Sequence, residues 1–393
     1  MNIPREERSH RLRELALLFL RLGSTAFGGP AAHIAMMEEE VVRRKKWLSE
    51  SQFLDLLGAS NLIPGPNSTE MAIHIGRERA GGLGLIVAGI CFILPAMAIV
   101  MLLAWTYTLY GTLPQVQGVM YGVKPVIIAV IAQAIWNLTS KTMAKPLLLI
   151  LALLAAAASL LGQPELLILF AAGTFMLTQQ TSTHRPSRLA MTLLIALGAV
   201  CLRAAHAIGL SAMPVALEPF SQQKLFLFFL KVGSVLYGSG YVLLAFLQGT
   251  LVEKYGWLTQ AQLLDAIAVG QFTPGPVFTT ATFIGFLLSG VSGALIATLG
   301  IFLPSFVFVA ISGRLIPAIR RSARAGAFLD GVNSASLGLM MAVTLQLGRD
   351  AVVDLTTIAL ATMTALLLIR WKVNSAWLVL AGAAVGLTRA LWL

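Results

Sequence analysis

Two stretches of the chain share one interrupted apolar pattern: Asn61-Leu62-Ile63-Pro64-Gly65-Pro66-Asn67-Ser68-Thr69-Glu70 and Gln271-Phe272-Thr273-Pro274-Gly275-Pro276-Val277-Phe278-Thr279. Proline has no backbone N–H and cannot continue a helix, and glycine weakens a helix further. A Pro-Gly-Pro sequence between apolar residues therefore predicts a helix end, a turn and a new helix start. Within a bilayer, such a break is tolerated only where protein or a water-filled cavity surrounds it.

The composition predicts a membrane protein. Of the 393 residues, 57% are hydrophobic and 11% are charged. Several apolar runs approach the roughly 20 residues that cross a bilayer. A net charge of +11 could indicate nucleic acid in a soluble protein, but its distribution fits membrane orientation better, so the expected partner is the lipid bilayer. Cys91 and Cys201 show no disulfide or metal spacing, and we expect neither a metal nor a cofactor.

An internal repeat relates the two Pro-Gly-Pro stretches. The spacing that aligns Trp47 with Trp257 also aligns Gln52 with Gln262 and both Pro-Gly-Pro sequences without a gap. Apolar composition alone would not align Trp, Gln and Pro-Gly-Pro in this way. We therefore expect a first repeat over residues 1–182 and a second over 222–393. The linker, 183–221, is expected to contain one transmembrane helix.

Each repeat is expected to begin with broken helices and to continue with fuller spans. In the first repeat, a helix from Leu15 should end near Gly28-Gly29-Pro30, and an amphipathic piece should follow from Ala32 to Val42. Ser49 with Gln52 predicts a helix-capping box, and Thr259 with Gln262 repeats it. Fuller spans are expected near 83–110, 116–138, 146–162 and 164–180, and again near 291–313, 327–348, 352–370 and 374–393.

The loop charges predict that the two repeats have opposite orientations. Arg43-Arg44-Lys45-Lys46 is basic throughout, whereas its counterpart Glu253-Lys254-Tyr255-Gly256 has one charge of each sign. In the next pair of equivalent loops the difference in charge is reversed: segment 111–118 has no charge, whereas segment 314–324 is basic. Since basic loops stay in the cytoplasm, we expect a cytoplasmic N-terminus and a periplasmic C-terminus. The expected fold is an all-α polytopic membrane protein with two inverted-topology repeats.

An inverted repeat with helices broken at matching positions is typical of secondary transporters, which hold their substrate near the midplane. Helix starts after the breaks carry partial positive charge and unpaired N–H groups that suit an anion. The alternative is ordinary capping of a helix start. The substrate-binding residues expected at the breaks are Gly28, Gly29, Asn61, Pro64, Gly65, Pro66, Asn67, Ser68, Thr69, Gly238, Gln271, Pro274, Gly275, Pro276 and Thr279.

Two cations occupy equivalent positions inside apolar helices, Arg21 and Lys231. A cation at the bilayer centre costs about 2.5–3.5 kcal/mol on insertion scales, so each needs a partner. A transported anion is one such partner, and we include both residues in the substrate site. The alternative is that both side chains reach toward the membrane interface.

Four further residues are candidates for proton coupling or for the transport path: Glu70, His33, His74 and Lys124. Glu70 could carry a coupling proton or pair with Arg21. A histidine titrates in the range that proton coupling needs, but a lone one is more often structural. Lys124 could line the path or reach toward the interface. The matched Asp55 and Asp265 are expected to fix their helices through hydrogen bonds.

Three motifs of the first repeat resemble the chromate ion transporter family: Phe27-Gly28-Gly29-Pro30-Ala31-Ala32-His33, Trp47-Leu48, and the stretch from Asn61 to Glu70. The likeness is to its long, two-domain members and covers nearly the whole chain. It implies chromate efflux across the bacterial inner membrane, chromate resistance, and halves of opposite orientation. The second repeat departs from the first motif, with Leu243 in place of His33.

The residues alone do not select chromate. Sulfate is also a tetrahedral dianion of similar size, so a sulfate or other oxyanion carrier stays open, as does a homodimer. We expect alternating access, in which one unit rocks against the other. An intramembrane enzyme is the less favoured class, because Gly-x-Ser-x-Gly, His-Glu-x-x-His and a cysteine pair are all absent from the sequence.

Overall fold

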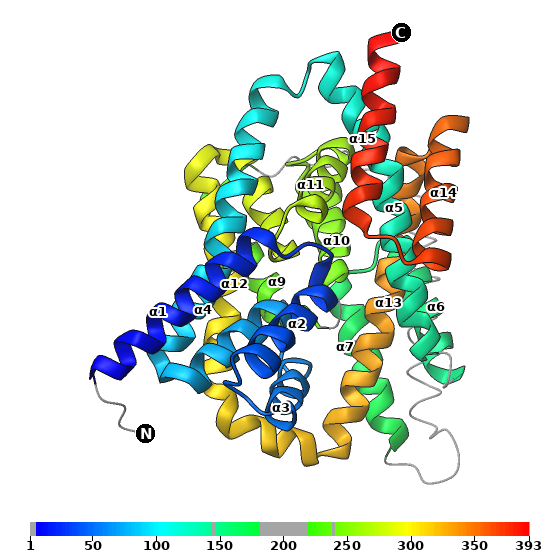
Figure 1. The fold of residues 1–393 in the computed structure, drawn as a ribbon. Helices are drawn as coiled ribbons and strands as arrows, with labels where there is room; N and C mark the ends of the chain where they lie inside the picture. Colours follow the sequence, from blue (N-terminus) through cyan, green and yellow to red (C-terminus); the bar gives the residue numbers. More distant parts are fainter. Residues whose placement is uncertain (1–4, 143–145, 181–218, 238–239, 393) are drawn as a thin grey trace.

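The computed structural model describes residues 5–142, 146–180, 219–237 and 240–392, and every regular element in these ranges is a helix (Figure 1). Five of these helices are long and apolar enough to cross a membrane. The predicted all-α polytopic membrane fold is therefore confirmed. The expected linker helix near 189–210, and Gly238, lie outside the described residues.

The element order of the first half recurs in the second. The first half contains α1 (Arg5–Thr25), α2 (Gly29–Glu38), the π-helix η1 (Glu39–Arg44), α3 (Glu50–Ser60), α4 (Asn67–Tyr110), α5 (Pro114–Thr142), α6 (Pro146–Leu160) and α7 (Glu165–Gln180). The second contains α9 (Gln222–Val235), η2 (Gly240–Val242), α10 (Leu243–Phe246), the π-helix η3 (Leu247–Lys254), α11 (Gln260–Phe272), η4 (Val277–Thr279), α12 (Thr280–Arg321), α13 (Ala323–Ala351), α14 (Leu355–Trp371) and α15 (Ser375–Trp392).

Local backbone features recur at equivalent positions. Both predicted capping boxes form, at Ser49 with Gln52 and at Thr259 with Gln262. The long helices α4 and α12 each contain a sharp turn, where Gly81 has φ +67° and Gly290 has φ +62°. Because a positive φ strongly favours glycine, these two residues allow the chain to turn at the same point in each half.

The turn at Gly81 divides α4 into a short helix and a longer one that pack on each other. Gly76 and Gly84 approach so closely that a Cβ on either would overlap the carbonyl of the other. At the turn, the Arg79 guanidinium lies 4.9 Å from the Trp47 ring and its Nη2 lies 2.9 Å from Glu14. The start of α3, the end of the short helix and α1 therefore meet at one end of the molecule.

The helices form two units that each draw on both halves. The hairpin unit contains α1–α4 and α9–α12, in which α1 packs on α4, α9 packs on α12, and α4 packs on α12. The six-helix unit contains α5–α7 and α13–α15. In it, α5 packs on α14 and α15, whereas α13 packs on α6 and α7, so each half completes the packing of the other. Figure 1 shows the six-helix unit on the right.

Small residues and one polar cluster join the halves within the six-helix unit. Gly122 of α5 and Gly382 of α15 touch through their backbones, and a Cβ on either would overlap the other helix. Tyr121 of α5 donates to the Asp354 carboxylate at 2.7 and 2.6 Å, and Arg389 of α15 lies 2.6 Å from the same carboxylate. Close glycine contacts and polar bonds between helices stabilise helix packing in membranes, so these contacts join the two halves within this unit.

Equivalent connections lie at opposite ends of the molecule. Figure 1 shows the connection from α4 to α5 at the top and the equivalent connection from α12 to α13 at the bottom. Helix α1 begins at the lower left and α15 ends at the top. Below, the end that holds α3 is the lower end, and the end that holds α11 is the upper end.

Candidate functional site

Both Pro-Gly-Pro sequences form the turns that they predict. Between α3 and α4, and between α11 and η4, the turn is buried and its glycine has a positive φ, +136° at Gly65 and +88° at Gly275. The next helices start directly after Pro66 and Pro276, and neither start has a side-chain cap. The first-turn N–H groups of these helices therefore keep bonding capacity that a ligand could use.

Each turn is held by the other half of the chain. The Gly65 N–H donates to the Leu236 carbonyl at 2.8 Å, and the Gly275 N–H donates to the Ala26 carbonyl at 2.9 Å. Ala26 and Leu236 are themselves equivalent, because each lies where the first helix of its half ends. This crossed pair of hydrogen bonds brings all the helix breaks to one place in the hairpin unit.

His33 contacts one of these two crossed hydrogen bonds. Its Nε2 lies 3.0 Å from the Ala26 carbonyl that also accepts from Gly275, and its ring stands on edge against Phe92 at 5.8 Å. The side chain is buried, and Nδ1 has no hydrogen-bond partner among the described residues. Gly28 and Gly29, with φ +104° and +76°, make the chain turn that brings His33 back to Ala26.

Glu70 lies in the first turn of α4 with its side chain fully buried. The Ser305 hydroxyl of α12 donates to its Oε1 at a long 3.5 Å, while Oε2 has no hydrogen-bond partner in the described part of the chain. Gly65 packs directly against this carboxyl, where a Cβ would overlap Glu70. The Tyr237 hydroxyl is close enough to interact with it electrostatically.

Other predicted residues surround the turns. Asn67 donates to the Asn61 side chain at 2.7 Å, and Thr279 donates to the Pro276 carbonyl at 2.8 Å, and neither bond caps a first-turn N–H group. Pro64, Pro66, Ser68, Pro274 and Pro276 are buried. Buried atoms that lack a partner among the described residues include Thr69 Oγ1, His74 Nε2 and Gln271 Nε2. Buried polar atoms without partners are uncommon, so their presence beside the turns makes this region a candidate binding site.

Arg21 pairs with a residue that the sequence analysis had not connected to it. Its Nη2 lies 2.7 Å from Glu40 Oε1, which also accepts from Arg44 at 3.0 Å. The alternative in which Arg21 neutralises Glu70 is therefore wrong. Glu40 lies in the π-helix η1 and its side chain is 10% exposed.

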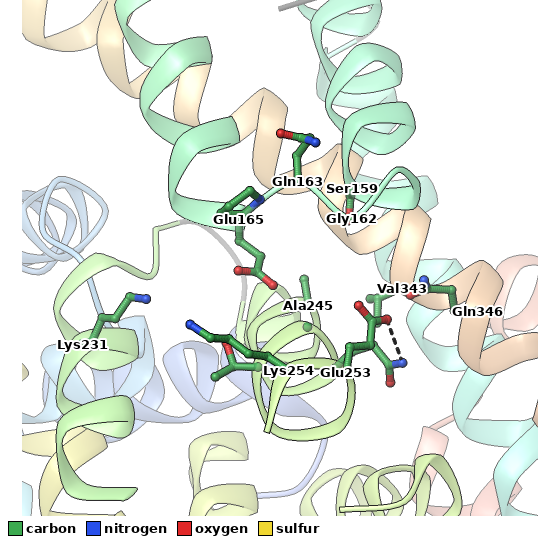
Figure 2. A pocket seen from close by; sticks show the side chains of 14 residues that line it. Ser159, Gly162, Gln163, Glu165, Lys231, Ala245, Glu253, Lys254, Val343 and Gln346 are labelled. Atoms are coloured by element: carbon green, nitrogen blue, oxygen red, sulfur yellow. Dashed lines mark hydrogen bonds between the residues drawn. The ribbon is translucent and has the colours of Figure 1, made fainter. Parts of the chain in front are cut away.

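Lys231 lies in a different environment from Arg21. It lines a cavity of about 370 Å³ between α9, η3, α13 and the connection from α6 to α7. Figure 2 shows Lys231 and Lys254 from the second half facing this space, with Glu165 from the first half pointing into it. The structure does not bring Lys231 together with Arg21, and among the described residues neither side chain hydrogen-bonds to a Pro-Gly-Pro turn, so their role as substrate ligands stays a prediction.

Lys124 bridges the two units. Its Nζ lies 2.9 Å from Asp265 Oδ1 of α11, and the Tyr107 hydroxyl donates to Asp265 Oδ2 at 2.7 Å. Asp265 thus does fix its helix through a hydrogen bond, but to the other half of the chain. A second cavity, of about 390 Å³, lies beside these side chains.

Sequence reasoning missed Ser305, Tyr237, Glu40 and Glu165. One signal was available for Ser305, since the repeat aligns Leu94-Pro95 with Leu303-Pro304 and so places residue 305 on the helix that crosses α4. No local pattern marks the other three. Their positions depend on how distant helices pack.

Broken helices that meet around buried polar groups, inside a polytopic helical membrane protein, define the class of membrane transporters with interrupted helices. Within that class the chain belongs to the chromate transporter family, whose sequence model matches it twice, over residues 13–178 and 223–387.

Similar proteins match most of the length of the chain. It is 33% identical to a chromate transport protein of Cupriavidus metallidurans, over 96% of this chain and 92% of the relative. It is 33% identical to a probable chromate transport protein of Synechococcus elongatus, over 93% and 91%, and 32% identical to a chromate transport protein of Pseudomonas aeruginosa, over 86% and 81%. No solved structure matches the chain.

Proposed function

We propose that this protein exports chromate from the cytoplasm across the bacterial inner membrane by secondary active transport, and thereby confers chromate resistance. Family membership and the names of the full-length relatives support chromate as the substrate. Export and its driving force are our inference from the arrangement of the helices.

The observation that carries the proposal is the crossed pair of hydrogen bonds at Gly65 and Gly275. Through it, two uncapped helix starts lie close together in the interior of the hairpin unit. Each contributes partial positive charge and free N–H donors, which suit a doubly negative tetrahedral ion. Asn67, Ser68 and Thr279 would add side-chain groups. We place the dianion between the two Pro-Gly-Pro turns.

We propose that residues 1–182 and 222–393 are repeats of opposite orientation, with the N-terminus in the cytoplasm and the C-terminus in the periplasm. The opposite ends reached by equivalent connections in Figure 1 support this arrangement. So do the cavity linings, since loops expected on the periplasmic side contribute to both: Lys254 lines one cavity and Gly111 lines the other.

We propose that Glu70 carries the coupling proton. An ionised carboxylate with one weak hydrogen bond and no cation is costly to bury, whereas the protonated form is not. Its place at the start of α4 puts it beside the proposed anion, so that proton and dianion compete for the same region. The second half has Thr280 at this position, so one carboxyl serves the whole site.

Reconstitution tests the proposal. Purified protein in liposomes would be given chromate under an imposed proton gradient, with sulfate in parallel. We expect chromate flux that depends on the gradient and that K231M and G275A reduce. Flux of sulfate with no flux of chromate would favour the oxyanion-carrier alternative. In cells, a drop in total chromium distinguishes export from a reductase, which changes oxidation state without export.

A further inference from the structure

The two helical hairpins are in different states. We call α2, η1 and α3 the first hairpin, and η2, α10, η3 and α11 the second hairpin. At equivalent positions, Leu54 of α3 is 55% exposed, whereas Leu264 of α11 is 2% exposed. Asp55 is exposed, whereas Asp265 is buried. A pair of repeats in the same state would show matching exposure, so this face of α11 is covered and the equivalent face of α3 is not.

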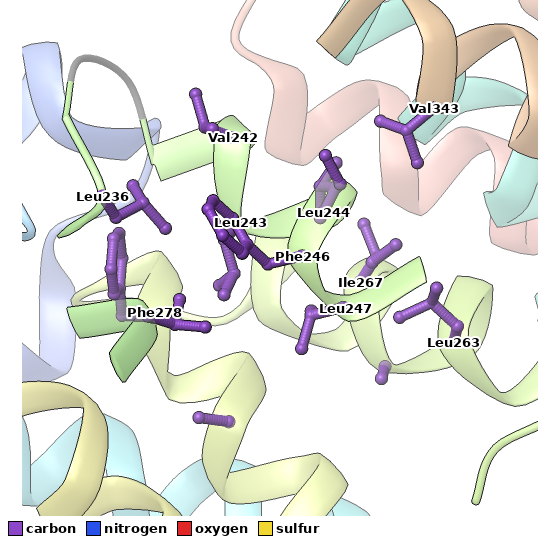
Figure 3. Packing of buried hydrophobic residues seen from close by; sticks show 14 of the residues in the cluster. Leu236, Val242, Leu243, Leu244, Phe246, Leu247, Leu263, Ile267, Phe278 and Val343 are labelled. Carbon is purple, nitrogen blue, oxygen red and sulfur yellow. The ribbon is translucent and has the colours of Figure 1, made fainter. Parts of the chain in front are cut away.

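The second hairpin is packed against the six-helix unit. Helix α11 contacts α5, α13 and α15, and α10 contacts α13. Figure 3 shows Leu244 on the second hairpin beside Val343 of α13, with Leu263 and Ile267 of α11 in the same cluster. The first hairpin packs on α4, but α3 has no comparable contact with α13, which is the equivalent of α5. Among the described residues, a hairpin is therefore packed against the six-helix unit at the upper end, and no comparable packing of a hairpin is present at the lower end.

An ion pair stands at the closed end, and the equivalent positions at the other end do not hold a pair of opposite charges. Lys124 and Asp265 are 18% and 8% exposed and lie 2.9 Å apart. The equivalents of these residues are Asn333 and Asp55, and both are exposed. An asparagine cannot form an ion pair with aspartate, so the two ends are chemically unequal even though the backbones repeat.

We propose that this structure is the conformation open at the lower, cytoplasmic end and closed at the upper end, and that Lys124, Asp265 and Tyr107 form the contact that keeps the upper end closed. The inference rests on the proposed alternating access. In the opposite conformation, α3 docks on α13 and brings Asp55 to Asn333, while α11 separates from α5. Because separating a buried ion pair leaves charges without partners, the end that has the pair closes more firmly, and the resting protein faces the cytoplasm.

Thiol labelling of the purified, full-length protein tests this. Leu54→Cys and Leu264→Cys would be made in a background with Cys91 and Cys201 replaced, and labelled with a membrane-impermeant maleimide in nanodiscs. We expect rapid labelling with Leu54→Cys and slow labelling with Leu264→Cys. Equal rates, or faster labelling of Leu264→Cys, would overturn the assignment of the open end.

Changes to the ion pair then test the contact itself. Lys124→Asn gives the upper end the same Asp–Asn pair as the lower end, and should raise labelling of Leu264→Cys by about tenfold. Asn333→Lys should have the opposite effect and slow labelling of Leu54→Cys, because it places a cation at the position equivalent to Lys124. Asp350→Asn, which removes another carboxylate from the same cavity, is the matched control and should change neither rate. Unchanged labelling with both Lys124→Asn and Asn333→Lys would overturn the role of the ion pair.

These readouts do not depend on transport. If liposomes show no chromate flux but the labelling pattern holds, the proposed substrate fails and the conformational assignment stands. If flux is present but labelling with Leu54→Cys and Leu264→Cys is equal, the assignment fails and the proposed function stands.

Discussion

A single carboxyl makes the centre of the site unequal in the two halves. Glu70 lies fully buried where the second half has Thr280, and among the described residues its carboxyl accepts one long hydrogen bond, from Ser305. His33 is likewise present in one half only, and it reinforces the turn of the other half through Ala26. A duplicated backbone therefore holds a set of polar groups that is not duplicated, and this is where we expect the coupling chemistry.

The substitution Glu70→Gln tests whether Glu70 carries the coupling proton or is needed to bind chromate. Glutamine keeps the size and hydrogen-bonding capacity of the protonated carboxyl but cannot release a proton. Accumulation of chromate driven by a proton gradient should fall by about tenfold or more, while exchange of chromate for chromate should persist. The matched control is Ser305→Ala, which removes only the weak hydrogen bond and should retain gradient-driven transport. Loss of both exchange and accumulation with Glu70→Gln would mean that the residue is structural.

At the scale of elements, close helix packing joins the two halves within the six-helix unit. Helix α5 of one half lies between α14 and α15 of the other, and Gly122 and Gly382 set the separation of α5 and α15. The six-helix unit should therefore act as a rigid body against which the hairpin unit moves.

Gly122→Leu should disrupt this unit. A bulky side chain would force α5 away from α15, and overpacking costs about 1–3 kcal/mol. We expect a lower melting temperature for the detergent-solubilised protein, measured by intrinsic fluorescence. Val385→Leu, on an exposed face of α15, is the comparison and should leave the melting temperature unchanged. A normal melting temperature with Gly122→Leu would show that the α5–α15 contact contributes little.

Local sequence signals predicted elements well and packing poorly. The capping boxes, the turns at both Pro-Gly-Pro sequences and most spans follow from proline, glycine and apolar run length, which act within a few residues. The span expected from residue 83 begins just after the turn at Gly81. The ion pair of Arg21 with Glu40, the contact of Lys124 with Asp265 and the exchange of helices between halves join residues far apart in the chain, and no local pattern specifies them.

At the scale of the whole molecule, equivalent connections should face opposite sides of the membrane. Lys45→Cys and Lys254→Cys would be labelled in intact cells and in inside-out vesicles with an impermeant thiol reagent. We expect Lys254→Cys to react in cells and Lys45→Cys to react only in the vesicles. Reaction of both on one side would contradict the inverted repeat.

The asymmetry of the hairpins determines the side of the membrane to which the resting molecule would be open. A site between the Pro-Gly-Pro turns that opens to the cytoplasm at rest can collect its ion there, and closure of α3 on α13 would expose the same ion to the other side. Such a cycle needs no motion inside the six-helix unit.

Chromate uptake into inside-out membrane vesicles tests this account most directly, because export from the cell appears there as accumulation. We expect vesicles that contain the protein to accumulate chromate when energised, and those with Glu70→Gln to lose that accumulation. Accumulation in right-side-out vesicles instead, or none in either orientation while another oxyanion is transported, would contradict chromate export by this protein.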